Sequence, residues 1–276
     1  MTIGAVLKQA RKDAGLSQAE AAAGICSQAM LSAIESNKYT PNVTLVIALC
    51  QRLGITLETV ALAQNFAIGQ QKDFNQQVET LCNTHQYRKL LTFLNTDAVI
   101  DSIADGAETQ AYYYYLAVAE FQGANNWDAA LQNLQLCLAN AAHTKTLTTL
   151  TRLATISAAY IETLKNQQVS PTVQDNIDRA LGGIDAARYT ENLNIVYYLA
   201  ALLYFHVKQD TTSAKVLAQG IHFTTSHNSH YMLANDYYLL AKIAQRLGKA
   251  DEAAAATQRS QLFNELFGEA VFADFD

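Results

Sequence analysis

Apolar side chains recur three and four residues apart along most of this 276-residue sequence, which predicts amphipathic helices rather than strands. Near the start, the pattern predicts helices over 3–14 and 43–53, two short helices between 17 and 37, and a further helix over 56–66. Farther along, it predicts helix pairs, most clearly over 108–141 and 231–263. Only two prolines and twelve glycines interrupt the chain, so long helices are favoured and the predicted fold class is all-α.

The two short helices have well-defined ends. Ser17 is followed three residues later by Glu20, which is the spacing of a capping box, and Gly24 ends the first helix. Ser27 is expected to cap the second helix, and Asn37 to end it, because Asn tolerates the left-handed conformation. The apolar positions expected to face inward on the second helix are Met30, Leu31 and Ile34.

With these features, the stretch resembles the Cro/C1-type helix-turn-helix. Short alanine-rich helices around a glycine turn also occur in other all-α domains, which is the alternative interpretation. The resemblance implies that Arg11 and Glu35 form an ion pair that braces the domain, and that Gln18 contacts a DNA phosphate. The DNA-binding residues it implies are Gln18, Ser27, Gln28, Ala29, Ser32, Ala33, Asn37 and Lys38. Ala29 and Ala33 present only methyl groups, so direct base readout would depend mainly on Gln28 and Ser32.

The turn between the two helices is one residue shorter than in most phage-repressor versions. In this it is similar to the PlcR/Rgg (RRNPP) type of peptide-pheromone receptor. That resemblance implies a five-helix DNA-binding domain over 1–66 and a sensing and dimerisation domain over 72–276. The second domain would be a right-handed solenoid of about five tetratricopeptide-like helix pairs. The expected partners are a double-stranded operator, a short signalling peptide and a second copy of the chain.

The sequence itself also indicates helix pairs beyond residue 72. Small or compact residues recur 34 to 50 residues apart where the second helix of each pair would meet the first. These positions are Leu90, Ala130, Ala180, Ala214 and Ala253. The spacing is irregular, so an irregular helical bundle remains the alternative, although stacked pairs tolerate insertions in their loops.

First helices of such pairs line a concave surface on which a peptide can lie. Asn amides offer a donor and an acceptor to a peptide backbone, and Tyr adds contact area with a polar tip. Arg152 is the expected cation for a peptide carboxylate. The residues expected to bind the peptide are Tyr115, Arg152, Asn194, Tyr198, Asn235, Tyr238 and Lys242.

Charge restricts where nucleic acid can bind. Residues 1–66 carry five Lys/Arg and four Asp/Glu, whereas residues 67–276 carry fourteen and twenty-one. The acidic remainder cannot follow a phosphate backbone, so DNA is expected to bind the N-terminal domain alone. That domain is only weakly basic, which argues against DNA binding unless a dimer doubles the phosphate contacts.

Other chemistry is not indicated. The four cysteines are widely spaced, and no glycine-rich phosphate loop or nucleophile elbow is present. His222, His227 and His230 lack a fourth ligand nearby, so no metal or other cofactor is expected. No signal peptide or membrane span is expected, which favours the cytoplasm. The chain is therefore predicted to be a peptide-controlled transcription regulator and not an enzyme.

Two alternatives remain from the sequence. The repeats could bind or sequester a protein partner, with the helix-turn-helix as a secondary feature. The chain could also be a repressor without any small ligand, in which the helical domain serves only for oligomerisation.

Overall fold

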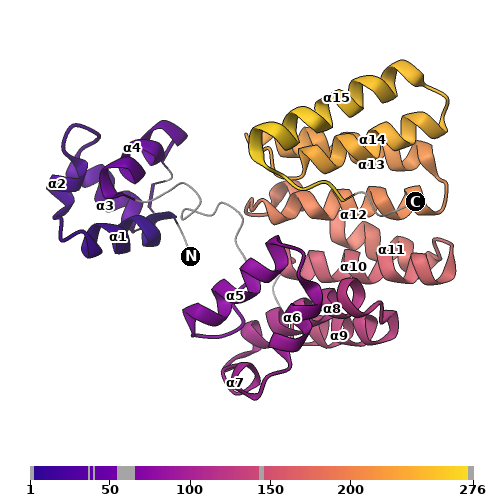
Figure 1. The fold of residues 1–276 in the computed structure, drawn as a ribbon, viewed down its shortest axis with the longest axis horizontal. Helices are drawn as coiled ribbons and strands as arrows, with labels where there is room; N and C mark the ends of the chain where they lie inside the picture. The colour runs from indigo at the N-terminus through magenta and orange to yellow at the C-terminus, as the bar shows by residue number, and fades with distance from the viewer. Residues whose placement is uncertain (1–2, 37, 40, 55–65, 143–145, 273–276) are drawn as a thin grey trace. The chain divides into compact units, whose positions relative to one another are not determined.

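The computed structural model describes residues 3–36, 38–39, 41–54, 66–142 and 146–272 (Figure 1). These residues form helices, turns and irregular segments, and no strand occurs among them. The chain divides into two compact units, residues 1–64 and residues 65–276. The division at 66–72 that the sequence suggests remains a prediction about domains.

The first unit contains four described helices. They are α1 (Ile3–Asp13), α2 (Gln18–Ala22), α3 (Gln28–Glu35) and α4 (Val43–Leu53). Their buried side chains form a single core that includes Leu7, Leu31, Ile34 and Leu49. The fifth helix, predicted over 56–66, falls almost entirely on residues 55–65, which lie outside the described residues.

The local signals of this unit act as predicted. Ser17 accepts a hydrogen bond from the Glu20 N–H, and the Glu20 carboxylate accepts one from the Ser17 N–H, which completes the capping box. Gly24 has a φ of +73° in the turn that follows α2. Ser27 caps α3 by accepting from the Met30 N–H at 3.1 Å. The prediction for the Met30 side chain is wrong, because it is 37% exposed while Leu31 and Ile34 are buried.

The described part of the second unit consists of five helix pairs with two short inserted elements (Figure 1). The pairs are α5 (Lys72–Asn83) with α6 (Tyr87–Leu94), α8 (Gly106–Ala124) with α9 (Trp127–Ala139), α10 (Thr149–Asn166) with α11 (Pro171–Leu181), α12 (Asn192–His206) with α13 (Asp210–Ser226), and α14 (Leu233–Arg246) with α15 (Ala250–Phe267). The inserted elements are α7 (Asp97–Ile100) and the 3-10 turn η2 (Ile184–Ala186). This confirms the predicted all-α fold with five pairs.

Small residues let neighbouring helices approach closely, both within a pair and between pairs. A Cβ added to Gly220 of α13 would lie 2.7 Å from the Tyr197 Cβ of α12. A Cβ on Gly123 of α8 would lie 2.8 Å from the backbone of Tyr87, at the start of α6. Four of the five predicted compact positions, Leu90, Ala130, Ala180 and Ala253, are buried. Helix pairing in this unit is therefore built on side chains that leave room for a neighbouring helix.

Residues 66–70, at the start of the second unit, are held against α5 and α8. The Phe66 N–H donates to the Tyr115 hydroxyl at 3.0 Å, and the Ile68 N–H donates to Asn75 Oδ1 at 2.8 Å. Asn75 Nδ2 in turn donates to the Gly69 carbonyl. These contacts hold the backbone of the segment between the two predicted domains. No helix within the described ranges is both long and apolar enough to cross a membrane.

Candidate nucleic-acid interface and peptide site

The outer face of α3 is polar and open. Gln28, Ala29 and Ser32 are exposed, and Ala33 is half-buried, whereas Leu31 and Ile34 on the opposite face fill the core. Ser27 keeps its hydroxyl on the Met30 N–H as the helix cap. This face therefore offers one amide, one hydroxyl and methyl groups, which is a set that can approach base edges in a major groove.

A buried ion pair holds α1 against α3. Arg11 Nε and Nη2 donate to the two carboxylate oxygens of Glu35 at 2.6 and 2.9 Å, and Arg11 Nη1 donates to the Leu16 carbonyl at 2.8 Å. Burial is the largest single influence on the Glu35 pKa and raises it. Hydrogen bonds from Arg11 and Gln18 and nearby positive charge outweigh burial, so that the pKa is lowered overall. The pair implied by the resemblance is thus present, and it fixes the orientation of α3.

Gln18 takes part in the same cluster. Its Nε2 donates to Glu35 Oε2 at 2.8 Å, so the amide points at a carboxylate within the unit. The expectation was that this amide meets a DNA phosphate. A phosphate contact would require the amide to leave Glu35, and that role stays a prediction.

Exposed lysines occur just after α3 and on α1. Lys38 is exposed beyond its C-terminal end, next to Tyr39, which is 45% exposed. Lys8 and Lys12 of α1 are exposed as well. Asn37, the other residue expected at the DNA backbone, lies outside the described residues. These cations are few, as the charge count of the sequence indicated.

The two asparagines predicted for the second unit are buried and bind backbone. Asn194 of α12 is 1% exposed, and its Nδ2 donates to the Tyr231 carbonyl at 2.9 Å. Asn235 of α14 is also 1% exposed, and it binds the segment that follows α15. Both amides thus make the kind of backbone contact expected for a bound peptide, but they make it to this chain's own backbone.

The other predicted residues of α12 and α14 differ in exposure. Tyr198 is 3% exposed, and its hydroxyl has no hydrogen-bond partner. Burial, with the nearby Asp236 carboxyl second, raises the pKa of Tyr198 well above its usual value. Tyr238 and Lys242 are half-buried, with Lys242 Nζ 5.5 Å from the centre of the Tyr238 ring.

Tyr115 and Arg152 are buried and bind other residues of this chain, whereas the sequence predicts that they line an open groove. Tyr115 is 4% exposed, and its hydroxyl accepts the Phe66 N–H. Arg152 is 3% exposed, and its Nη1 donates to the carbonyls of Ala180 and Gly182 at 2.6 and 2.8 Å. The sequence could not show that the carbonyls ending α11 would take up this guanidinium.

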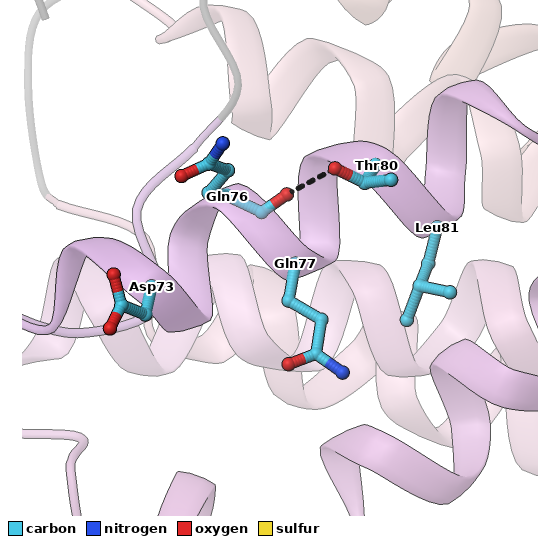
Figure 2. Close-up of a pocket in the computed structure, with 5 residues that line it drawn as sticks. All are labelled: Asp73, Gln76, Gln77, Thr80 and Leu81. Atoms are coloured by element: carbon cyan, nitrogen blue, oxygen red, sulfur yellow. Dashed lines mark hydrogen bonds between the residues drawn. The ribbon is translucent and has the colours of Figure 1, made fainter.

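A depression lies on the surface of α5, far from these residues in the sequence (Figure 2). The residues that line it are Asp73, Gln76, Gln77, Thr80 and Leu81. In Figure 2, Gln76 and Thr80 lie above the helix, and the other three lie below it. Thr80 Oγ1 donates to the Gln76 carbonyl at 2.8 Å, so this hydroxyl is satisfied within the helix. All five side chains belong to one helix, which makes the depression a surface feature rather than an enclosed site.

Histidines of the second unit serve in ring contacts. His227 stacks on Tyr189 with ring centres 4.0 Å apart, and His230 stacks on Phe267 at 3.6 Å. No group of three or more His, Cys, Asp or Glu side chains suited to a metal ion occurs among the residues that the structure describes.

Known proteins share this architecture. Residues 7–60 match the family model described as helix-turn-helix. The structure of PlcR from Bacillus thuringiensis in complex with the peptide PapR7 and DNA has a TM-score of 0.61 at 18% identity, covering 97% of this chain and 96% of that one. The chain shares its fold with PlcR. Apo PlcR gives a TM-score of 0.59 at 16% identity, covering 97% and 94% of the two chains.

A second protein has the same arrangement. ComR from S. thermophilus, in complex with DNA and its signalling peptide ComS, has a TM-score of 0.52 at 14% identity, covering 97% of this chain and 95% of that one. No curated protein matches the chain. Residues 7–60 therefore carry a helix-turn-helix, and the chain as a whole has the fold of PlcR and ComR.

Sequence reasoning missed three residues around Asn235. They are Asp236, which is 1% exposed, and Glu269 and Phe272 of the segment after α15. Asp236 could have been suspected from the sequence, because it directly follows Asn235 in the predicted groove. Glu269 and Phe272 lie more than 30 residues away from Asn235, and nothing in their local pattern indicates the contact.

Proposed function

We propose that this chain is a cytoplasmic transcription regulator that binds duplex DNA through α3 and is controlled by a short signalling peptide bound to its helix pairs. The observation that carries the proposal is the joint occurrence of a helix-turn-helix over 7–60 and the fold of PlcR and ComR over 97% of the chain. The structures of those two proteins contain DNA and a peptide. The proposal assigns no chemical reaction and no cofactor to the chain.

The DNA contacts would come from the open face of α3. Gln28 would read a base edge through its amide, with Ser32 beside it, while Ala29 and Ala33 would touch thymine methyl groups. Lys38, Asn37 and Gln18 would contact phosphates and set the register of the helix. Ser27 would place the N-terminus of α3, whose amides favour a nearby phosphate. Such a set gives limited base discrimination, so sequence-dependent DNA shape would contribute.

The peptide site would centre on α14 and α12. Asn235 has the strongest support because its buried amide already binds main-chain atoms through both its nitrogen and its oxygen. Tyr198, Asn194, Tyr238 and Lys242 would surround the peptide. Tyr115 and Arg152 would act indirectly, since Tyr115 holds Phe66 against α8 and Arg152 holds α10 to the end of α11.

A homodimer is the expected functional unit, since one short recognition helix reads few bases. Two copies would bind half-sites about 34 Å apart, one turn of DNA. Leu262 and Leu266 lie one turn apart on α15 and are 50% and 63% exposed, which supports an apolar contact between copies. A peptide can control such a dimer only by binding one arrangement more tightly than another.

DNA binding is tested by selecting duplexes from a random library with the full chain and footprinting the selected sequence. Replacing Gln28 and Ser32 together by Ala should lower affinity for that sequence by about 10- to 100-fold, as expected for losing 1–3 kcal/mol of base contact. The matched control replaces Gln132 and Gln135, both exposed on α9, by Ala. Equal affinity of both double variants would refute the assignment of α3.

A further inference from the structure

The chain turns back on itself after α15. Gly268 ends this helix with a φ of +64°, and its N–H donates to the Asn264 carbonyl at 2.8 Å. Asn264 Nδ2 donates to the Glu269 carbonyl at 2.6 Å and fixes the turn. The following residues, Glu269–Phe272, have no regular secondary structure. We call them the return segment.

Asn235 binds the return segment as an amide binds a peptide ligand. Its Nδ2 donates to the Ala270 carbonyl at 3.1 Å, and its Oδ1 accepts the Phe272 N–H at 2.8 Å. These two contacts reach only main-chain atoms, so they are independent of side-chain identity. The same Nδ2 also donates to Glu269 Oε1 at 2.6 Å.

The Glu269 carboxylate lies at the N-terminus of α14. The cap residue of this helix, Met232, provides no side-chain hydrogen bond. Asn235, in the first turn of this helix, donates its Nδ2 to Glu269 Oε1, which places the carboxylate beside the positive end of the helix dipole. Burial is the largest influence on the Glu269 pKa and raises it.

Phe272 reaches the first helix pair. Its ring stacks on His85, just after α5, with ring centres 4.9 Å apart and planes at 11°. Asn235 and Glu269, in contrast, belong to the last helix pair and the turn that follows it. Four residues therefore connect opposite ends of the array, as an extended peptide lying across the paired helices would.

With the return segment bound, three buried polar groups of this site have no hydrogen-bond partner. Asp236 Oδ1, the Tyr198 hydroxyl and Glu269 Oε2 are buried without a hydrogen-bond partner. Asp236 and Tyr198 are 1% and 3% exposed, so water does not readily satisfy them. Unpaired buried polar groups cost free energy. A ligand that supplied a donor to Asp236 would fit this site better than the return segment does.

We propose that the return segment is an internal occupant of the peptide site, and that the ligand is a short acidic-aromatic peptide of the form Glu-x-x-Phe that displaces it. This inference rests on the proposed function, since it specifies the ligand of the same site. The ligand would place its carboxylate at the N-terminus of α14, its backbone on Asn235 and its aromatic ring on His85. Displacement would free the return segment and unlink the last helix pair from the first.

The test uses the full chain and a fluorescein-labelled synthetic peptide that copies residues 268–273, Gly-Glu-Ala-Val-Phe-Ala. A tethered segment competes at a high effective concentration, so the unmodified chain should bind the peptide weakly. Phe272→Pro removes the N–H that Asn235 accepts and the ring on His85, and should raise affinity for the peptide at least tenfold. Leu136→Ala, an exposed apolar position on α9, is the control and should leave affinity unchanged.

Substitution of Asn235 provides a second test of the site. Asn235→Ala in the Phe272→Pro chain should lower peptide affinity at least tenfold, and so should replacing the Glu of the peptide by Gln. Hydrogen exchange gives a readout without any variant: the Phe272 amide should be protected in the unmodified chain and should lose protection when peptide is added. Equal peptide affinity of the unmodified and Phe272→Pro chains, or an unprotected Phe272 amide, would overturn the proposal.

Selection from a random heptapeptide library against the Phe272→Pro chain separates this proposal from the proposed function. Binders that Asn235→Ala abolishes but that lack the Glu-x-x-Phe pattern would refute the ligand class and keep peptide control. If no peptide from the library binds, both the proposed ligand class and the proposed control by a peptide are refuted. Enrichment of Glu-x-x-Phe sequences would support both.

Discussion

Arg11 and Glu35 lie 24 residues apart in the sequence, and two charge-assisted hydrogen bonds of 2.6 and 2.9 Å join their side chains. Their side chains are only 12% and 3% exposed. The pair connects α1 to the helix that presents Gln28 and Ser32, so it links the stability of the first unit to its candidate DNA-binding face.

Removing one partner of this pair should be costly. Glu35→Ala leaves the Arg11 guanidinium in a mostly buried site with one carbonyl partner, and we expect the free energy of unfolding of the first unit to fall by about 3 kcal/mol. Denaturant unfolding of the full chain, followed by hydrogen exchange in α1 and α3, measures this. Asp13→Asn on the exposed end of α1 is the control and should change little. A cost below about 1 kcal/mol for Glu35→Ala would show that the pair is dispensable.

The two units should respond to acid in opposite directions. The Glu35 pKa is lowered in the folded chain, so its contribution is complete above the unfolded pKa of about 4.3 and is lost as pH falls below it. Burial, with the charge of Glu269 second, raises the pKa of Asp236 well above its usual value. Deprotonation of Asp236 at higher pH is therefore unfavourable in the folded chain. The amides of the return segment should become better protected from hydrogen exchange as pH falls from 8 toward 4.

Asp236→Asn tests the predicted direction of this pH dependence. The groups that face Asp236 are Glu269 of the return segment and Tyr198 of α12. The substitution removes the repulsion of Glu269 and should protect the Phe272 amide by about 1 kcal/mol more at pH 7.5, a factor of roughly 5 in exchange. Asp251→Asn, exposed in the first turn of α15, should have no effect. Weaker protection in Asp236→Asn would mean that the carboxylate stabilises the site.

Close helix approach at Gly123 gives a stability prediction. Because its added Cβ would lie 2.8 Å from the Tyr87 backbone, Gly123→Ala must displace α6 from α8 and should cost about 1–3 kcal/mol. Gly106 is the matched position in the same helix, with nothing within 4 Å of an added Cβ. Gly106→Ala should be neutral or slightly stabilising, since Ala favours helix. Thermal unfolding of both variants distinguishes crowding from helix propensity; equal melting temperatures would contradict the crowding argument.

Arg152 should behave as a structural residue. Its Nη1 joins two carbonyls at the end of α11, and burial is the largest influence on its pKa and lowers it. Arg152→Ala should lower the free energy of unfolding of the second unit by about 2 kcal/mol, as expected for lost hydrogen bonds to a charged group. The exposed Arg179→Ala on α11 is the control. If Arg152→Ala left stability unchanged but abolished peptide binding, Arg152 would contact the peptide as the sequence predicts.

Lys38 should act on the DNA backbone. If it neutralises one phosphate, Lys38→Gln should lower affinity for all duplexes alike and reduce the slope of log K against log salt by about one per protomer. The exposed Lys215→Gln on α13 should leave the slope unchanged. A loss of affinity confined to the selected sequence would instead place Lys38 at a base.

The sequence by itself determined the features that depend on residues at most four positions apart. The Ser17 capping box, the Gly24 turn, the Ser27 cap and the buried Leu31 and Ile34 follow from local hydrogen bonds and helical periodicity. The five helix pairs were instead predicted from the family resemblance and from compact residues that recur 34 to 50 residues apart. Periodicity gives a helix face but not where its neighbour ends, which is why Met30 is exposed against expectation.

Tertiary structure alone decided which partners the buried polar groups take. Arg152 binds carbonyls 28 and 30 residues away, and Asn235 binds the return segment 34 to 37 residues away. A desolvated guanidinium or amide must be paired, but many groups along the chain could satisfy it. Only the packing of α10 on α11, and the turn at Gly268 that brings Glu269–Phe272 back to α14, selects among them.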